Sequence, residues 1–302
     1  MDLWYSEKHG EFAKFSIKVE KHLYGGHSGY QRIDVFESYE FGRFLTLDGV
    51  MMLTQKDEFV YHEMMVHVPM AVNPDMRRVL VIGAGDGGIV RELAKYKGIA
   101  EIDLVEIDPQ VIEVCKEYLP YTAKGFEDER LRVYNQDGLK FIRKVKREYD
   151  LIIVDSTDPF GPGEGLFTRE FYGNCFNALG DDGIMVNQLG SPFYADDAAA
   201  MKRAYDKLLV TFPICHAYMA NVPTYPSGLW LFGYAAKGLE PVPGIGSGTG
   251  LGTMPGAESG FAGDFGKWEK LCISTKYYNS RLHIGCFALP NYIKELLDEK
   301  KS

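Results

Sequence analysis

The sequence predicts an α/β protein in which a parallel sheet with helices on both faces follows a small antiparallel β domain. Three observations predict this fold. Residues 13–54 alternate apolar and polar side chains, as half-buried strands do. From Arg78 onward, short apolar runs alternate with helical segments, which is the βαβ pattern of a parallel sheet. The apolar run 149–154 ends in Asp155 and Asp158, and open α/β sheets place their sites at such strand ends.

Length and composition narrow the class of protein. The chain has 302 residues, enough for one large core or for a main domain and a small one. Its net charge of −9 argues against a nucleic-acid partner, which needs a basic surface. No apolar run approaches the roughly 18 residues of a membrane span. The five cysteines are dispersed without a CxxC pair, which favours a cytoplasmic protein with reduced thiols and no zinc site.

The N-terminal β domain is assigned to residues 1–56. Asp48-Gly49 stands between apolar runs and is a strong hairpin signal. Gly25-Gly26 is interpreted as another turn of this domain.

The second domain is assigned to residues 57–302. It opens with a helix over 57–72, where Asp57 and Glu58 suit the first turn because carboxylates favour the positive end of the helix dipole. We expect strands at 79–83, 102–107, 131–135, 150–155, 183–188 and 229–236, and helices at 87–96, 109–118, 138–146, 171–179 and 198–212. Residues 237–265 are rich in Gly, Pro and Ser without periodicity, so we expect a flexible surface loop at about 240–264.

The loop GAGDGG, residues 83–88, follows a strand and opens a helix. It satisfies the GxGxxG pattern, and Glu106 ends the next strand where a carboxylate reaches ribose hydroxyls, so an NAD enzyme is one hypothesis. Asp86 argues against it, because a carboxylate in this loop repels a pyrophosphate. The same carboxylate attracts a sulfonium or ammonium group, so the loop favours an adenosyl-sulfonium nucleoside. Asp137-Gly138, after the third strand of the second domain, lies where adenine is expected, although a helix cap explains it equally well.

Six segments together resemble the spermidine synthase family of polyamine aminopropyltransferases. They occur in family order and cover nearly the whole chain: DEFVYHEM (57–64), VIGAGDGG (81–88), VEID (105–108), DSTDPFGPGEGLF (155–167), PTYPSG (223–228) and KYYNSRLHIGCFALP (276–290). The resemblance implies a Rossmann-like domain of the methyltransferase type after the small β domain, assembled as a homodimer or homotetramer. It implies transfer of an aminopropyl group from decarboxylated S-adenosylmethionine to putrescine, giving spermidine and 5′-methylthioadenosine. It implies no metal and no redox cofactor.

The resemblance also assigns roles residue by residue. Asp155 matches the catalytic aspartate of the family. The residues that match the amine-binding positions are Tyr61, Asp158, Tyr225 and, from a looser alignment, Trp4. The residues that match the nucleoside-binding positions are Gln31, His62, Asp86, Glu106, Asp137, Gly138 and Pro162.

The chain departs from the family pattern at a few positions. Ala84 replaces a common glycine, and its methyl group fits if φ there is negative. Met52 and Leu189-Gly190 differ at positions that can reshape the acceptor pocket. The acceptor therefore stays open among putrescine, agmatine, cadaverine, norspermidine and spermidine. Three rival interpretations are a putrescine N-methyltransferase that uses S-adenosylmethionine, a non-catalytic binding homologue, and the NAD enzyme.

Overall fold

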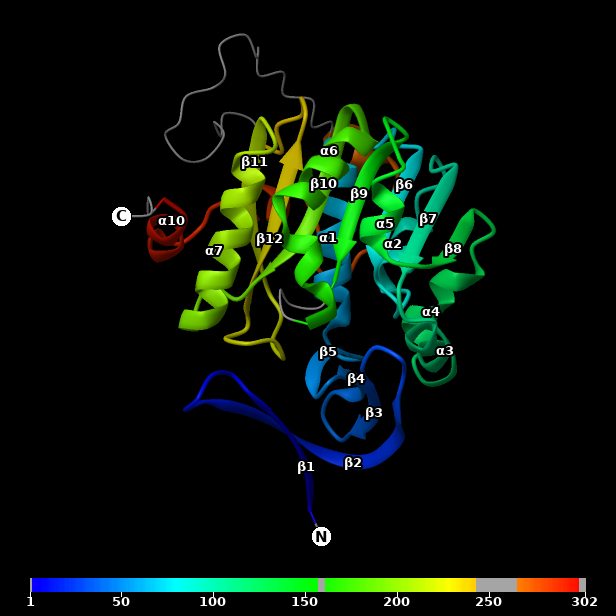
Figure 1. Ribbon diagram of the computed structural model, residues 1–302, viewed down its shortest axis with the longest axis vertical. Helices are drawn as coiled ribbons and strands as arrows, with labels where there is room; N and C mark the ends of the chain where they lie inside the picture. The colour runs from blue at the N-terminus through cyan, green and yellow to red at the C-terminus, as the bar shows by residue number, and fades with distance from the viewer. Residues whose placement is uncertain (1, 157–160, 243–264, 299–302) are drawn as a thin grey trace.

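The computed structural model describes residues 2–156, 161–242 and 265–298 of the chain, and it contains two sheets, with the N-terminal sheet below the central sheet in Figure 1. The N-terminal sheet is antiparallel, with its five strands in sequence order. These strands are β1 (Leu3–Lys8), β2 (Lys14–His27), β3 (Arg32–Ser38), β4 (Gly42–Leu47) and β5 (Val50–Thr54). Asp48 and Gly49 join β4 to β5 with φ angles of 49° and 81°, as the two positive-φ positions of a tight hairpin require.

The turn predicted at Gly25-Gly26 is wrong. Both glycines lie inside β2 and pair with β3. The chain reverses instead at Ser28 to Gln31, where the Ser28 hydroxyl accepts hydrogen bonds from the backbone N–H groups of Tyr30 and Gln31. Gly29 in this turn has no positive φ, and the serine side chain closes the turn, so the glycine pair 25–26 was the misleading signal.

The central sheet has seven strands in the order β11-β12-β10-β9-β6-β7-β8. Its strands are β6 (Arg78–Gly83), β7 (Glu101–Glu106), β8 (Leu131–Asn135), β9 (Tyr149–Asp155), β10 (Leu179–Gly190), β11 (Ile214–Asn221) and β12 (Leu229–Ala236). The strands β8, β7, β6, β9 and β10 are mutually parallel, which confirms the α/β class. Their carboxyl ends therefore meet at one edge, which faces the N-terminal sheet.

At the other edge the sheet departs from the predicted parallel arrangement. Strand β12 pairs antiparallel with both β10 and β11. The reason is the short connection 222–228 between β11 and β12: Val222 N donates to Gly228 O at 2.8 Å, and such a tight link can join only antiparallel neighbours. Strand β11 was not predicted, because the sequence ICHAYMAN mixes small, polar and apolar residues without clear alternation.

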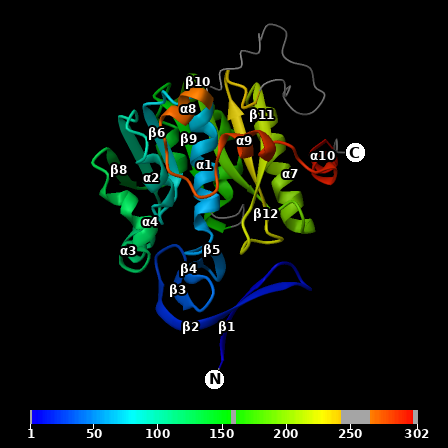
Figure 2. The same ribbon diagram turned by 180° about the vertical axis from the view of Figure 1, so that it is seen from behind.

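Helices cover both faces of the central sheet. In Figure 1 the helices α5, α6 and α7 lie in front, and in Figure 2 the helices α1, α2, α8 and α9 lie on the opposite face. The helices are α1 (Glu58–Val72), α2 (Gly88–Leu93), α3 (Pro109–Tyr118), α4 (Pro120–Ala123), α5 (Gly138–Ile142), α6 (Arg169–Ala178), α7 (Ala195–Leu209), α8 (Phe265–Lys270), α9 (Ser280–Cys286) and α10 (Asn291–Asp298), with 3₁₀ turns η1 (Lys124–Glu127) and η2 (Gly161–Phe167). The helices α2 and α5 are shorter than predicted. None of the helices in the described ranges has both the length and the apolar character that a membrane crossing requires.

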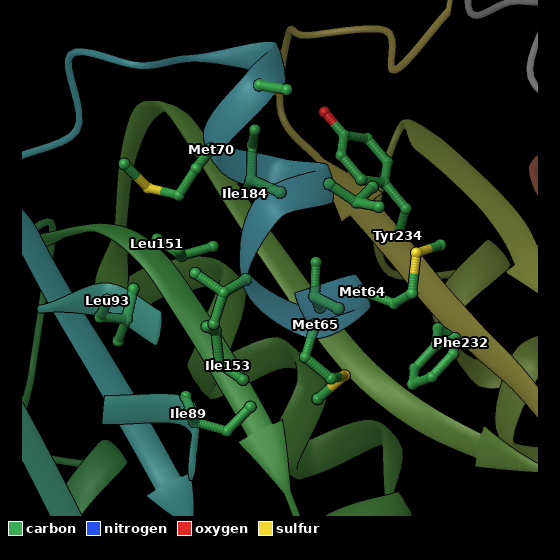
Figure 3. Packing of buried hydrophobic residues seen from close by; sticks show 14 of the residues in the cluster. Met64, Met65, Met70, Ile89, Leu93, Leu151, Ile153, Ile184, Phe232 and Tyr234 are labelled. Atoms are coloured by element: carbon green, nitrogen blue, oxygen red, sulfur yellow. The ribbon is translucent and has the colours of Figure 1, made fainter. Parts of the chain in front are cut away.

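Helix α1 is buried along almost its whole length. Met64, Met65 and Met70 pack among side chains of the central sheet such as Ile153 and Phe232 (Figure 3). A helix that is covered on all sides has no polar face, which is why its periodicity was weak in the sequence.

A polar tether holds the C-terminal region against α1. The buried Glu63 carboxylate accepts backbone N–H groups from Lys276, Tyr277 and Tyr278 at 2.8–2.9 Å. The same helix therefore anchors a segment more than 200 residues away in sequence, as separations of 213 to 215 residues show.

The N-terminal sheet and α3 share one hydrophobic cluster. Ile33, Val35, Leu45 and Leu53 of the N-terminal sheet pack with Val111, Val114, Cys115 and Leu119 in and beside α3. This shared cluster joins the N-terminal sheet to the parallel part of the central sheet.

The loop after β6 is held against the end of β9. Gly83 pairs with Asp155, and Ala84 N donates to Asp155 O at 3.0 Å. Gly83 has a φ of +85°, and a Cβ there would lie 1.8 Å from Asp155 O, so only glycine fits. Ala84 has a φ of +62°, so the condition of a negative φ is not met and the methyl group is held in a left-handed conformation.

We predict that Gly83→Ala destabilises the fold and displaces the end of β9. A left-handed alanine and a steric overlap with backbone together cost at least about 2 kcal/mol. Urea unfolding measures the change in midpoint. Gly98→Ala is the control, because no atom lies within 4 Å of the added Cβ. Equal midpoints for the two variants would contradict the prediction.

Candidate active site

A cavity opens between the carboxyl ends of the central strands and the N-terminal sheet. Strands β6, β7, β9 and β10 contribute Gly83, Glu106, Asp155 and Gln188 to its wall, while the N-terminal sheet contributes residues that include Met52. The topology alone explains this position, because side chains at the ends of parallel strands converge at one edge.

Asp155 lies at the end of β9 and faces this cavity. The Tyr61 hydroxyl, from α1, donates a hydrogen bond of 2.7 Å to Asp155 Oδ1. Burial and the nearby charge of Asp86 raise the pKa of Asp155 to about 6, although His62 and the Tyr61 hydrogen bond act in the opposite direction. A carboxylate with a raised pKa at a strand end can accept a proton from a bound amine.

Asp86 and His62 form an ion pair beside Asp155. His62 Nε2 is 3.3 Å from Asp86 Oδ1, and Asp86 Oδ1 also accepts the backbone N–H of Gly88 at 2.8 Å. Burial opposes charge on both groups, but their attraction prevails. The pKa of Asp86 is therefore lowered, and Asp86 and Glu58 raise the pKa of His62 to about 10.

Glu106 ends β7 and forms the nucleoside side of the cavity wall. Its Oε1 accepts the backbone N–H of Asp108 at 2.8 Å. Burial raises the pKa of Glu106 to about 7, and the charges of Asp108 and Asp155 act in the same direction. Gln31 lines the same cavity, and its Nε2 donates to Asp108 Oδ2 at 3.0 Å. The turn of the N-terminal sheet is thus attached to the end of β7.

Asp137 and Gly138 follow β8 and begin α5. Asp137 Oδ1 accepts the Leu139 N–H at 2.8 Å, so the helix-cap interpretation is confirmed, and both residues also line the cavity. The cap uses Oδ1 of Asp137, and Asp137 also borders the part of the cavity next to Glu106.

Tyr225 lines the cavity from the connection between β11 and β12. Its hydroxyl donates to the backbone oxygen of Met52, and its ring lies 5.9 Å from that of Tyr61. The connection is fixed by Thr224, whose N and Oγ1 donate to Asp57 Oδ2 at 3.0 and 2.7 Å. Asp57 therefore ties the connection to the start of α1 and makes no side-chain cap of that helix.

Trp4 is not part of this arrangement, and two other candidate residues fall outside what the structure describes. Trp4 is 54% exposed and is absent from the cavity wall, because side chains alternate along β1 and those that point inward are Tyr5 and Glu7. Asp158 lies outside the described residues, as does the side chain of Pro162. The glycine-rich loop at 240–264 also falls outside them, apart from residues 240–242.

Glu7 is a cavity residue that the sequence reasoning missed. It is buried, and its Oε2 accepts Met51 N at 2.7 Å and the Tyr5 hydroxyl at 2.8 Å. Burial raises its pKa. The alternation of Trp4, Tyr5, Ser6 and Glu7 was the available signal, but residues before 13 were not interpreted as a strand.

The cavity wall suits organic cations. The described residues that line it include no lysine and no arginine but five carboxyl groups: Glu7, Asp86, Glu106, Asp137 and Asp155. His62, Asp86 and Asp155 have ligand-type atoms within 4.8 Å of one another. Both ring nitrogens of His62 already face carboxylates, so the ring has no lone pair to offer a metal ion, and an ammonium or sulfonium group fits these carboxylates better.

Comparisons with known proteins agree with this geometry. The spermine/spermidine synthase domain matches residues 58–241, and the spermidine synthase tetramerisation domain matches residues 3–55. A polyamine aminopropyltransferase of Alkaliphilus oremlandii (strain OhILAs) is 58% identical over 301 residues, which cover 100% of both chains. One of Clostridium perfringens (strain ATCC 13124) is 58% identical over 298 residues, which cover 99% of both chains.

Solved structures show the same fold. The crystal structure of a spermidine synthase in complex with the transition state analogue AdoDATO has a TM-score of 0.89 at 40% identity and covers 98% of this chain and 94% of its own. The spermidine synthase from Thermotoga maritima has a TM-score of 0.88 at 40% identity, with the same coverage. The cavity of carboxylates at the strand ends, the two matching domains and these relatives lead to one conclusion: the chain belongs to the spermine/spermidine synthase family and is a transferase of the polyamine aminopropyltransferase type.

Proposed function

We propose that the enzyme transfers the aminopropyl group of decarboxylated S-adenosylmethionine to putrescine and releases spermidine and 5′-methylthioadenosine. The observation that carries this proposal is the convergence of Asp86, Glu106 and Asp155 on one cavity without a lysine or arginine in its described wall. Two cationic substrates need such a wall, because carboxylates offset the repulsion between them.

The donor is expected to bind at the ends of β6, β7 and β8. Glu106 would accept hydrogen bonds from the ribose hydroxyls, and the adenine would lie beside Asp137 and Gly138. Asp86 would face the cationic aminopropyl-sulfonium part of the donor. Intact S-adenosylmethionine carries an additional carboxylate, which Asp86 and Asp155 would repel, so the geometry favours the decarboxylated donor.

The acceptor is expected to bind between Asp155 and the N-terminal sheet. An amine with a pKa near 10.4 is protonated at pH 7, and its deprotonation there costs roughly 4–5 kcal/mol. Asp155 takes this proton and orients the nitrogen lone pair, with Tyr61 holding the carboxylate. The nitrogen attacks the carbon next to sulfur, a C–N bond forms, and the C–S electron pair returns to sulfur as the neutral thioether leaves.

The remainder of the acceptor has several possible contacts. Tyr225 offers a ring face to an ammonium group, and Glu7 offers a buried carboxylate. Asp158 is proposed to hold the amine, as the family resemblance implies. Met52 and Trp230 provide apolar wall for a methylene chain. This pattern suits a diamine with two charged ends and an apolar middle.

We also propose that residues 1–56 form a separate β domain through which cytoplasmic copies of the chain assemble into a homodimer or homotetramer. The support is the match of residues 3–55 to a tetramerisation domain. The remaining residues, 57–302, form the catalytic domain in this proposal.

Product analysis tests the proposed reaction. We expect that decarboxylated S-adenosylmethionine with putrescine yields spermidine and 5′-methylthioadenosine, identified by mass spectrometry. Agmatine, cadaverine, norspermidine and spermidine are tested in parallel, and a larger kcat/KM for one of them would replace putrescine as the acceptor. A methylated amine formed from intact S-adenosylmethionine would establish the N-methyltransferase instead, and no product from either donor would contradict transfer.

We expect Asp155→Asn to lower kcat by about 100- to 10,000-fold, because the amide cannot take the proton. The fold should persist, since the amide oxygen can still accept the Tyr61 hydroxyl. The matched control is Asp150→Asn at the other end of β9, where the carboxylate accepts the backbone N–H groups of Arg77 and Arg78. Near-wild-type turnover in Asp155→Asn would remove Asp155 from the catalytic role.

We expect Glu106→Gln to weaken binding of 5′-methylthioadenosine by about 10- to 100-fold, the usual effect of losing charge-assisted hydrogen bonds. Isothermal titration calorimetry measures this affinity directly. Glu101→Gln is the control, because Glu101 lies at the opposite end of the same strand and pairs with Arg78. Unchanged affinity in Glu106→Gln would show that the nucleoside binds elsewhere.

A further inference from the structure

A chain of alternating charges runs from α2 to the donor side of the cavity. Arg91 on α2 contacts both carboxylate oxygens of Glu58, with Nη1–Oε1 at 2.8 Å and Nη2–Oε2 at 2.9 Å. Glu58 Oε2 is 2.6 Å from His62 Nδ1, one helical turn further along α1. His62 Nε2 then lies 3.3 Å from Asp86 Oδ1. Of these four residues, His62 and Asp86 line the cavity, whereas Glu58 and Arg91 do not.

The geometry defines the charge of His62. Each ring nitrogen faces a carboxylate oxygen, so each must carry a hydrogen to avoid placing a lone pair against an anion. The ring is therefore an imidazolium. Its position is fixed as well, because a Cβ at Gly88 would lie 2.3–2.5 Å from three ring atoms, which shows how closely the backbone of α2 approaches the ring.

Charged and titratable side chains from several elements surround this imidazolium. Charged or titratable neighbours of His62, Asp86 and Glu58 are Glu58 and Tyr61 of α1, Arg91 of α2, Asp155 of β9, Cys115 of α3 and Tyr121 of α4. Arg91 makes its bidentate contact with Glu58, and its charge also acts on Asp86, where it lowers the pKa of that carboxyl together with His62. Among these described neighbours, His62 is the cation in direct contact with a cavity carboxylate.

We propose that Glu58, held by Arg91, is a positioning residue that keeps His62 as an imidazolium, and that this imidazolium keeps Asp86 and Asp155 ionised for their cationic substrates. The role in catalysis rests on the proposed function, whereas the charge state of His62 does not. Without the imidazolium, two carboxylates would face each other across an empty cavity, and one of them would hold a proton at neutral pH.

The sign of the effect follows from the pKa directions. His62 lowers the pKa of Asp86 and also lowers that of Asp155. A neutral His62 would therefore raise the pKa values of Asp86 and Asp155. On acidification, each carboxylate would then become protonated at a higher pH. The acid limb of kcat/KM should move to higher pH, while activity at high pH should change little.

The decisive variant is Glu58→Gln, compared with the wild type and with Glu63→Gln. Glu63 is the matched control: it is a buried glutamate of the same helix whose three hydrogen bonds go to residues 276–278. Both variants lose a buried carboxylate and some stability, but only Glu58→Gln removes a charge that contacts the ring of His62. If Glu58→Gln does not fold, Arg91→Met replaces it, with Arg91→Lys as the variant that restores a cation.

Two readouts need no substrate. The ring nitrogens of ¹⁵N-labelled histidine, with His62 identified by its absence in His62→Gln, report protonation, and ¹³C-labelled aspartate carboxyls report Asp86 and Asp155. We expect a doubly protonated His62 at pH 8 in the wild type and in Glu63→Gln, and a ring that loses its proton at a lower pH in Glu58→Gln, with the Asp86 titration shifted upward. These signals decide the charge state even if the protein transfers no aminopropyl group.

The third readout is the pH profile of aminopropyl transfer. We expect Glu58→Gln to lose about fivefold in kcat/KM at pH 6 and less than about twofold at pH 9, because an acid limb that moves up by about one pH unit from a pKa of about 6 lowers activity mainly below that pKa. Glu63→Gln should keep the wild-type acid limb. A His62 ring that is neutral at pH 8 in the wild type, or acid limbs and carboxyl titrations that coincide in all three proteins, would overturn the proposal.

Discussion

The structure depends on the pairing of charges that are buried along α1. This helix packs against one face of the central sheet with almost no exposed surface, yet Asp57 precedes its first residue, Glu58, and the helix carries His62 and Glu63. A buried ionised group without a partner is costly, so each of these side chains must meet its partner wherever the fold places it. The partners come from the connection 222–228, from α2, from the loop after β6 and from residues 276–278. One helix therefore sets the relative positions of most of the cavity wall.

Much of this architecture could be predicted from the sequence. The strands of the parallel half are short apolar runs with a clear period, and Asp155 could be placed at a strand end because the run before it stops abruptly. The parts that could not be predicted depend on contacts distant in sequence. Strand β11 forms because β12 and the packed helices supply its partners, and its own residues show no period. The left-handed conformation of Ala84 is imposed by the pairing of the neighbouring Gly83 with Asp155.

The candidate site, too, could be predicted only in part from the sequence. Asp86, Glu106 and Asp155 were predicted because each follows a strand, and the parallel topology then brings the three together without further information. The first strand was not predicted, so Glu7 was overlooked, and Trp4 lies on the exposed face of β1, away from the cavity wall. The spacing of Glu58 and His62 by four residues is visible in the sequence, but a link from Glu58 to Arg91 on another helix can be recognised only when the helices are seen side by side.

The hydrophobic cluster shared by the N-terminal sheet and α3 limits how such a chain can evolve. Ile33 and Leu45 of the N-terminal sheet pack against Val111 and Leu119 in and beside α3. A change of side-chain volume in either group therefore disturbs the packing of the other. Substitutions there must be matched in pairs, and the first 56 residues cannot be exchanged for an unrelated β domain without exposing apolar surface of α3. The N-terminal sheet and the catalytic domain are therefore expected to evolve together.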